Sequence, residues 1–251
     1  MEQIKYYMAP MEGVTGYVFR NAYAKYYGGV ESYFTPFVAN KKLGHREKND
    51  VCPEHNAGMA VVPQILTNRA EDFLAIAEIL REYGYDTVNL NLGCPSGTVA
   101  ARGRGAGFLA MPDELDHFLE EIFEKCPLRI SIKTRIGKED PAEWERLLAI
   151  YEKYPLEELI VHPRVQTDFY KNRVNLEAFA RAEKNSRHSL CYNGDIVDAA
   201  SAAHIREGFP SVDKFMIGRG LIKHPWLLEE LSGGRQEKQE RKERFFRFHN
   251  A

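Results

Sequence analysis

The stretch AEDFLAIAEILREYGYDTVNLNLG, residues 70–93, contains the unit from which the fold can be predicted. Its first half has helical period, since apolar residues that would share one face recur at spacings of three and four: Phe73, Ile76, Ala77 and Leu80. Gly84 is suited to end that helix. Its second half, 86–93, is an apolar run typical of a buried strand. Alternation of helices and buried strands indicates parallel strands joined by crossover helices.

The same unit recurs along the chain. Eight apolar, β-branched-rich runs are followed by loops and helical stretches: KYYMAP (5–10), ESYFTPFV (31–38), MAVVPQIL (59–66), DTVNLNLG (86–93), LRISIKTRI (128–136), ELIVHP (158–163), HSLCYNG (188–194) and DKFMIGRG (213–220). Another helix is predicted from Asp198, a suitable N-cap, to Gly208. Eight such units in 251 residues are typical of the (β/α)8 TIM barrel, the fold predicted for residues 1–232. A doubly wound sheet, the alternative, would place a GxGxxG turn where this chain has APMEGVTG.

Composition and charge limit the class of protein. A hydrophobic content of 44% and a charged content of 28% are those of a globular protein with a sizeable core. No apolar run approaches the roughly 18 residues of a membrane span, and the N-terminus lacks a secretory pattern, so a cytoplasmic protein is expected. The net charge of −2 neither demands nor excludes a nucleic-acid partner.

The cysteines and the tail predict little by themselves. Cys52, Cys94, Cys126 and Cys191 form no CxxC pair and are expected to be free thiols. His45, Cys52 and His55 lack a fourth ligand at a usual spacing, so no metal site is predicted. Residues 233–251 are charged and are predicted to start a further, truncated helical segment, with a solvated tail as the alternative.

Polar residues stand at the predicted C-terminal ends of the strands, where barrels of this kind carry their functional groups. They are Glu12, Gln64, Asn91, Cys94, Lys133, Arg135, His162, Arg164, Asn193, Asp195 and Arg219. Together they would form a pocket at one mouth of the barrel. Gln64 and Asn91 could instead be satisfied polar groups at the rim, but a lysine on a buried strand must be paired or must serve a ligand.

The last two strand ends suggest a phosphorylated ligand. The turn IGRG at 217–220 opens into a helix beside the turn NGD at 193–195, so backbone N–H groups and Arg219 would form a phosphate cradle. Lys133 and His162 would lie deeper, where they could neutralise negative charge on the ligand. A flavin fits this description, because its reduced ring carries negative charge, and other phosphorylated ligands fit almost as well.

Cys94 lies in a Gly-Cys-Pro-Ser turn directly after a predicted buried strand. Such a cysteine is often only a small apolar side chain. Here the glycine-rich segment ARGRGAGF follows, and a loop of that kind can approach a ligand closely. An ordinary thiol is mostly protonated at neutral pH and can donate a proton. The spacing leaves open whether Cys94 is an acid or a nucleophile.

Taken in order, these motifs resemble the tRNA-dihydrouridine synthases, flavin-dependent barrel enzymes that reduce a uridine of tRNA. The resemblance is carried by MAPMEGVTG (8–16), PQIL (63–66), NLGCPS (91–96), GRGAG (103–107), IKTRIG (132–137), VHPR (161–164), YNGDI (192–196) and MIGRGL (216–221). It implies that FMN is held by Pro10, Met11, Glu12, Gln64, Lys133, His162, Asn193, Gly194, Asp195, Gly218 and Arg219. It also implies that Asn91, Arg135 and Arg164 face the uracil, and that Cys94 is the general acid.

The implied reaction is transfer of a hydride from reduced flavin to C6 of uracil and of a proton from Cys94 to C5, with NADPH or NADH as the reductant. The uridine must leave its stack to enter such a pocket, so the enzyme must also hold nearby phosphates. Basic residues in the mouth-side loops are candidates for that contact, unless they are ordinary solvated charges: Lys41, Lys42, Arg46, Lys48, Arg102, Arg104, Lys171 and Arg173.

The chain departs from the family pattern in two places. Val165 follows Arg164 where the family usually has threonine, and a C-terminal helical domain that helps to hold tRNA would be nearly absent, so weak tRNA binding is expected. Two alternatives stay open. One is an FMN barrel that acts on a free pyrimidine, as dihydroorotate and dihydropyrimidine dehydrogenases do. The other is a flavin- or RNA-binding protein without catalysis.

Overall fold

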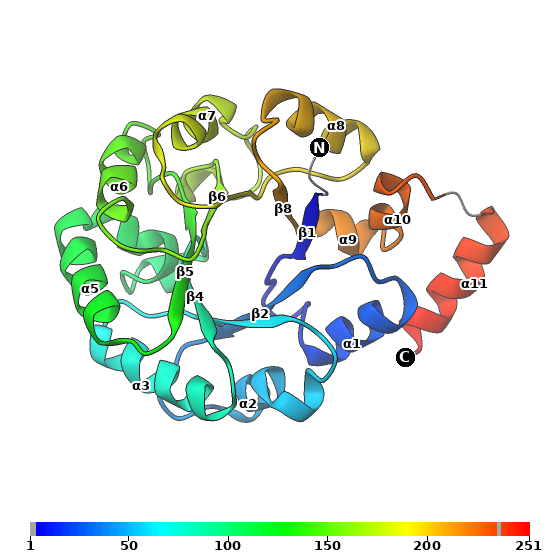
Figure 1. Cartoon of the computed structure of the whole chain (residues 1–251), viewed down its shortest axis with the longest axis horizontal. Helices are drawn as coiled ribbons and strands as arrows, with labels where there is room; N and C mark the ends of the chain where they lie inside the picture. The colour runs from blue at the N-terminus through cyan, green and yellow to red at the C-terminus, as the bar shows by residue number, and fades with distance from the viewer. Residues whose placement is uncertain (1–3, 235–236) are drawn as a thin grey trace.

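The computed structural model describes residues 4–234 and 237–251, and its centre is a closed barrel of eight parallel strands (Figure 1). The strands are β1 (Lys5–Met8), β2 (Ser32–Val38), β3 (Val61–Ile65), β4 (Thr87–Leu92), β5 (Arg129–Arg135), β6 (Leu159–His162), β7 (Leu190–Tyr192) and β8 (Lys214–Ile217). Each strand pairs with its neighbours in sequence, and β1 closes the ring by pairing with β8. The predicted (β/α)8 barrel is therefore confirmed.

Helices surround the barrel, as Figure 1 shows. They are α1 (Tyr17–Tyr26), α2 (His45–Val51), α3 (Ala70–Glu82), α4 (Gly97–Ala100), α5 (Pro112–Lys125), α6 (Glu143–Tyr151), α7 (Leu176–Asn185), α8 (Ala199–Gly208), α9 (Arg219–Lys223), α10 (Leu227–Leu231) and α11 (Lys238–His249). In the part of the chain that the structure describes, three 3₁₀ turns lie in the loops: η1 (Pro53–His55), η2 (Gly105–Ala110) and η3 (Gln166–Asp168). The predicted cap of α8 is confirmed, because the Asp198 carboxylate accepts the backbone N–H of Ser201.

The strands are shorter than predicted where they approach the mouth. The run 213–220 was predicted as one strand, but β8 ends at Ile217 and α9 begins at Arg219. The run 188–194 likewise shrinks to Leu190–Tyr192, which leaves Asn193 and Gly194 in a loop. The glycines explain both differences, since a residue without Cβ lets the chain turn out of the strand at once.

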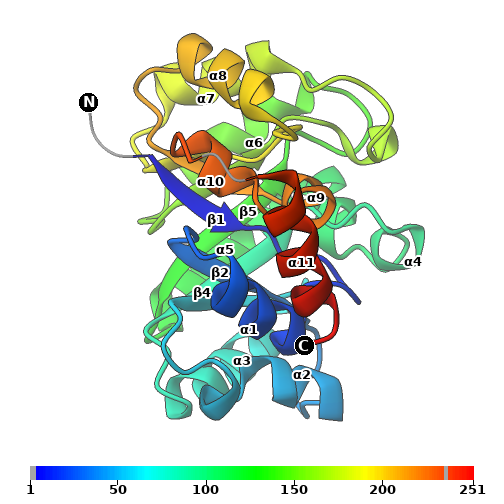
Figure 2. The same cartoon turned by 90° about the vertical axis from the view of Figure 1, so that its right-hand side faces the viewer.

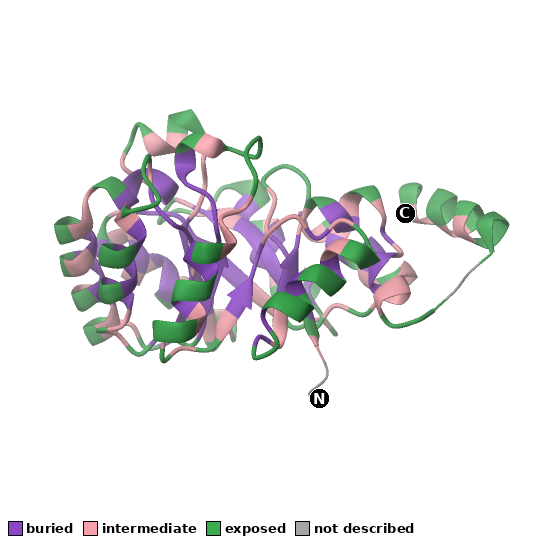
Figure 3. Ribbon diagram, turned by 90° about the horizontal axis from the view of Figure 1, so that it is seen from above, coloured by how far each residue is buried: buried purple, intermediate pink, exposed green. Residues whose placement is uncertain are grey.

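Alternation along β4 separates the core from the barrel interior. Val88, Leu90 and Leu92 are fully buried in the same apolar cluster as the α3 side chains Phe73 and Leu80. The residues between them, Asn89 and Asn91, point to the other side of the strand, into the barrel. Figure 3 shows the buried strands flanked by helices whose outer faces are exposed. The polar side chains at the mouth thus stand on rigid, buried backbone.

The tail forms a helix that packs on the barrel. Phe248 of α11 makes edge-to-face contacts with Phe19 of α1 and with Tyr27, the residue that follows α1. Arg244 donates two hydrogen bonds of 2.6 Å to Glu229 of α10. The helix predicted within 233–251 is confirmed, while its assignment to a separate domain stays a prediction. Among the described residues, no helix has the length and apolar character needed to cross a membrane.

Candidate active site

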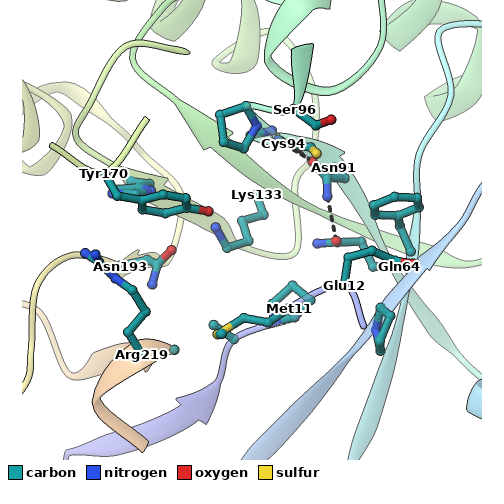
Figure 4. A pocket seen from close by; sticks show the side chains of 18 of the residues that line it. Met11, Glu12, Gln64, Asn91, Cys94, Ser96, Lys133, Tyr170, Asn193 and Arg219 are labelled. Carbon is teal, nitrogen blue, oxygen red and sulfur yellow. Dashed lines mark hydrogen bonds between the residues drawn. The ribbon is translucent and has the colours of Figure 1, made fainter. Parts of the chain in front are cut away.

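A cavity of about 480 Å³ opens at the C-terminal end of the barrel (Figure 4). Its size falls within the range typical of small-molecule sites. Every strand or the loop after it contributes to the lining. The lining residues are Ala9, Pro10, Met11, Glu12, Val14, Pro36, Phe37, Gln64, Asn91, Gly93, Cys94, Pro95, Ser96, Lys133, His162, Phe169, Tyr170, Asn193, Gly194, Asp195, Gly218 and Arg219.

The cavity brings together most of the predicted site. All the residues predicted to hold the cofactor line it, as do Cys94 and Asn91. Arg102, Arg104, Arg135 and Arg164, which were predicted to contact substrate, do not. Within residues 4–234 and 237–251, no cluster of three or more histidine, cysteine, aspartate or glutamate side chains is arranged to hold a metal ion. The roles assigned to the lining residues stay predictions.

Glu12 is held at the rim by the turn after β1. The Thr15 hydroxyl accepts the backbone N–H of Met11 at 2.7 Å, which closes that turn. Burial raises the pKa of Glu12, although its ion pair with Arg46 acts in the opposite direction. Arg46, one of the basic residues proposed to meet RNA, is therefore already paired with an acid of this chain. Lys41 is paired as well, with Glu71 at 2.5 Å and Asp72 at 2.9 Å.

Lys133 and His162 stand on the neighbouring strands β5 and β6 and form one wall of the cavity. Burial, and then the charge of Arg135, lowers the pKa of Lys133 to about 8. Burial also lowers the pKa of His162 well below its usual value, and the cations around it lower that pKa further. Since Arg164 Nη1 can only donate, His162 Nε2 accepts its bond of 2.9 Å, and the ring proton of the neutral imidazole is on Nδ1. The wall therefore carries a readily titrated ammonium beside a neutral ring.

The turns after β7 and β8 are close-packed and suit a phosphate. A Cβ on Gly194 would lie 2.1 Å from the Tyr192 hydroxyl, and one on Gly220 would lie 2.3 Å from the Ile196 carbonyl oxygen. Only glycine fits these positions without displacing its neighbours. Arg219 reaches the cavity from the second turn and donates a 2.5 Å hydrogen bond to Asp195. Arg219, Gly194 and Gly218 thus line the cavity together where the phosphate cradle was predicted.

Asp195 organises the arginines around the cradle. Burial alone would raise the pKa of Asp195, but the hydrogen bonds and charges of Arg164 and Arg219 outweigh that effect and hold it below its usual value. The carboxylate stays ionised at neutral pH and balances part of the local positive charge. Arg219 also lies 4.8 Å from the ring centre of Tyr170, in a cation–π contact.

Cys94 is half-buried on the opposite side of the cavity, where Figure 4 shows it beside Asn91. The Asn91 carboxamide oxygen accepts the backbone N–H groups of Gly93 at 3.0 Å and of Cys94 at 2.9 Å. Burial raises the pKa of the thiol and outweighs a backbone hydrogen bond at Ser96 that lowers it; the nearby Glu12 carboxylate adds to the rise, and Lys133 acts against it. The thiol is protonated at neutral pH, as a general acid must be.

The glycine-rich loop after Cys94 fixes the position of the thiol. The Ala106 N–H donates to the Cys94 carbonyl oxygen at 3.1 Å. Gly105 has a φ of +55°, and a Cβ there would lie 2.9 Å from the Cys94 Cβ. A side chain at Gly105 would therefore be strained and would press on the thiol-bearing residue. The close approach predicted for this loop is to Cys94 itself.

Arg135 and Arg164 lie behind the cavity wall. Arg135 is fully buried and donates to the carbonyl oxygens of Gly93, Val165 and Phe169 at 3.1, 2.8 and 2.7 Å. Arg164 is 2% exposed and donates to the Asn172 carbonyl oxygen and to Asp195. Contact of either side chain with a uracil would require these bonds to open. In this structure the two arginines hold the segment 165–172 in place.

That segment supplies lining residues that the sequence analysis missed. Phe169 and Tyr170 line the cavity and are 41% and 50% exposed. Phe169 has a φ of +50°, and among the residues that the structure describes it is the only non-glycine residue with a positive φ. The sequence did carry a signal for them, because Phe169 and Tyr170 are two adjacent aromatic residues in the otherwise polar stretch QTDFYKNR, 166–173. Exposed rings at the rim can stack on a flat ligand.

Arg102 and Arg104 stand outside the cavity. They lie between α4 and η2, in the segment that projects from the mouth side of the barrel in Figure 2. Arg102 is exposed and Arg104 is partly exposed, so both side chains are accessible to a large partner rather than to a bound small molecule.

The residues present fit a flavin mononucleotide. The cavity combines a cationic cradle at one end with Lys133 and the amides of Gln64 and Asn91 at the other. Asp195 and Glu12 are the acids that line it, and each is paired with an arginine. A phosphate at the glycine turns and a planar ring against Lys133 would therefore each meet groups of the required character.

Comparison with known proteins agrees with the fold and the motifs. Residues 7–250 match the family model described as dihydrouridine synthase. The chain is 26% identical to tRNA-dihydrouridine synthase B of Pasteurella multocida over 224 residues, which cover 88% of this chain and 67% of that protein. It is 28% identical to the probable tRNA-dihydrouridine synthase 2 of Bacillus subtilis over 232 residues, 89% of this chain and 70% of the relative.

A solved structure of morphinone reductase superposes with a TM-score of 0.59 at 15% identity, covering 92% of this chain and 86% of that one. At that identity the likeness shows the barrel fold alone. The family model, by contrast, spans nearly the whole chain, and the motifs at the cavity lie in the matched range. The chain belongs to the dihydrouridine synthase family.

Proposed function

We propose that this protein is a tRNA-dihydrouridine synthase, which reduces the C5–C6 double bond of a tRNA uridine. The observation that carries the proposal is the meeting of a protonated Cys94 thiol and a cationic cradle in one cavity, within a chain that matches the family over residues 7–250. The names of the relatives, tRNA-dihydrouridine synthases, support tRNA as the substrate.

The residues of this chain divide the work between the two ends of the cavity. Arg219 and the turns at Gly194 and Gly218 would hold the phosphate of FMN, and Lys133 would neutralise negative charge on its ring. When bound and reduced by NADPH or NADH, FMN supplies the hydride that C6 of the uracil accepts. Gln64 and Met11 would line the remaining ring edges. His162, neutral at physiological pH, adds a donor without a further positive charge.

Cys94 completes the reduction. Its thiol donates a proton to C5, so the hydride and the proton together saturate one double bond, and the thiolate recovers its proton from solvent. The raised pKa of Cys94 keeps the proton on sulfur until the substrate arrives. Asn91 holds the turn that carries the thiol and stands beside it, where a base would lie.

An anaerobic single-turnover experiment tests the proposal. The protein is loaded with FMN, its flavin is reduced, and a tRNA transcript without modifications is added while the flavin absorbance is followed. We expect reoxidation faster than in the sample without RNA, together with dihydrouridine in the recovered transcript. Free orotate and free uracil, added to parallel samples, should leave the flavin reduced.

Two outcomes would contradict the proposal. Reoxidation by a free pyrimidine but not by tRNA would identify a pyrimidine dehydrogenase instead. A flavin that binds and stays reduced with every substrate would indicate a flavin-binding protein without this catalysis. A matched transcript in which the modified uridine is replaced by cytidine controls for non-specific effects of RNA on the flavin.

A further inference from the structure

A chain of buried amides links the bottom of the cavity to the turn that carries Cys94. Gln64, Asn89 and Ser131 stand side by side on β3, β4 and β5, since Asn89 is the register partner of both neighbours. Gln64 Nε2 donates to Asn89 Oδ1 at 2.7 Å, and Asn89 Nδ2 donates to the Ser131 hydroxyl at 2.8 Å. One layer nearer the mouth, Asn91 Nδ2 donates to Gln64 Oε1 at 2.7 Å. Figure 4 marks the hydrogen bond between Asn91 and Gln64 with a dashed line.

The direction of every amide in this chain follows from its upper end. The backbone N–H groups of Gly93 and Cys94 can only donate, so the Asn91 atom that faces them must be oxygen. Its nitrogen then faces Gln64, which turns the Gln64 oxygen toward Asn91 and its nitrogen toward Asn89. The backbone donors of the turn therefore fix the direction of each amide in the chain.

Ser131, at the lower end of the chain of amides, fits the same direction of hydrogen bonding. The Ser131 hydroxyl donates to the Val88 carbonyl oxygen at 3.3 Å, which leaves its lone pairs to accept from Asn89. Asn89 is 0% exposed and Ser131 is 3% exposed, and neither lines the cavity. Gln64 and Asn91, which do line it, each use one amide N–H within the described part of the chain. Each therefore has a second N–H with which to meet an acceptor atom of a ligand.

We propose that Asn89 is a positioning residue, which holds Gln64 and, through Gln64 and Asn91, the Cys94 turn, without touching the ligand. An apolar side chain at 89 would leave Gln64 Nε2 without its partner, and Gln64 would be free to turn away from Asn91. The turn would then lose its lateral support, and the cavity would lose two donors of fixed direction. The inference rests on the proposed function only where FMN is named as the ligand.

Site-resolved alkylation tests the support of the turn. The full chain loaded with FMN is treated with iodoacetamide, and the labelling rate of each cysteine is followed by peptide mass analysis. In Asn89→Leu we expect Cys94 to react up to about tenfold faster, the change that corresponds to losing one neutral hydrogen bond. Cys191, which is fully buried in the barrel, should stay unreactive and so reports on global loosening.

FMN release tests the fixed donors. Dilution of the loaded protein frees flavin, whose fluorescence gives the dissociation constant. We expect Asn89→Leu to bind FMN on the order of tenfold more weakly. Asn89→Asp should restore both measurements, because a carboxyl oxygen accepts from Gln64 while Ser131 can reverse its hydroxyl to donate. The matched control is Thr134→Val, which removes a buried 3.0 Å contact with the Tyr151 hydroxyl outside the amide chain and should change neither measurement.

Three results would overturn the inference: native labelling and affinity in Asn89→Leu, labelling of Cys191 in step with Cys94, or an Asn89→Asp protein as impaired as Asn89→Leu. If Asn89→Leu does not fold, Asn89→Ala gives the same comparison with a smaller side chain. Wild-type protein that holds no FMN would refute the proposed function, whereas the labelling comparison would still decide the role of Asn89.

Discussion

The two sides of the cavity differ in charge. The side built by β5 to β8 carries the lining cations Lys133 and Arg219, with Arg164 behind them and a single lining acid, Asp195. The side built by β3 and β4 carries the neutral amides of Gln64 and Asn91 next to Cys94. One barrel mouth thus has side-chain cations on one side and neutral amides on the other.

The difference shows in the ionisation of the residues on each side. On the cationic side, burial lowers the pKa of Lys133 to about 8, and burial with four neighbouring cations makes His162 neutral. On the amide side, burial raises the pKa of the Cys94 thiol. The cationic half is suited to bind an anion and the amide half to keep a proton ready for transfer. Separate changes on the two sides should therefore separate ligand binding from proton transfer.

The largest effect is expected on the amide side, from Cys94→Ala. Loss of a positioned general acid should reduce dihydrouridine formation by roughly 10²–10⁴-fold, while FMN affinity stays near the wild-type value. The measurement is single-turnover formation of dihydrouridine beside FMN release on dilution. Cys126→Ala is the matched control, because that half-buried thiol follows α5 away from the cavity. Unchanged product formation in Cys94→Ala would contradict the assignment of proton transfer to the amide side of the cavity.

The second-largest effect is expected on the cationic side, from Arg219→Gln. Arg219→Gln should weaken FMN binding by about 10- to 100-fold, the cost of losing a hydrogen bond to a charged group. Riboflavin, which lacks the phosphate, should bind Arg219→Gln and wild type alike. Arg129→Gln, at the opposite end of the barrel, is the control. An equal loss for both flavins would show that Arg219 contacts the ring or supports the fold rather than the phosphate.

Sequence reasoning reached the fold and the lining of the cavity because both follow from local patterns. Each strand end contributes its own polar residue, so Gln64, Lys133 and Asn193 could be assigned without knowing how the strands pair. Arg135 was different. Its long side chain was expected in the pocket, but three carbonyl oxygens from two other loops take up its donors, and those loops are brought near only by the barrel.

The role of Asn89 could not be predicted from the sequence either, because it depends on how the strands pair. The alternation in VNLNL places Asn89 and Asn91 on one face, yet only the register of β3, β4 and β5 puts Asn89 between Gln64 and Ser131. The direction of the amides then requires the backbone N–H groups of a turn several residues away. Pairwise contacts between strands are decided by tertiary structure, which a pattern along one strand does not contain.

A smaller effect should appear in the pH dependence of FMN binding. With a pKa of about 8 in the free protein, Lys133 is mostly an ammonium below pH 8 and mostly neutral above it. The anionic ring of reduced FMN favours the ammonium, so relative to pH 7 the affinity for reduced FMN should be roughly halved at pH 8 and lower by up to about tenfold at pH 9. Lys133→Met should bind more weakly and lack this decline. Parallel pH curves for the two proteins would show that Lys133 does not face the anionic part of the ligand.

The smallest effect is expected outside the cavity, from Arg102 and Arg104. Neither side chain lines the cavity, so Arg102→Gln and Arg104→Gln should leave FMN affinity unchanged. If both contact RNA phosphates, each change should weaken tRNA binding a few-fold and reduce the slope of log affinity against log salt by about 1. Lys184→Gln, in the last turn of α7 and so at the end of the barrel away from the mouth, should not alter the slope. Since Arg46 and Lys41 are already paired with acids of the chain, a slope that falls only for Arg102 and Arg104 would confine the RNA contact to the side of the mouth that carries Cys94.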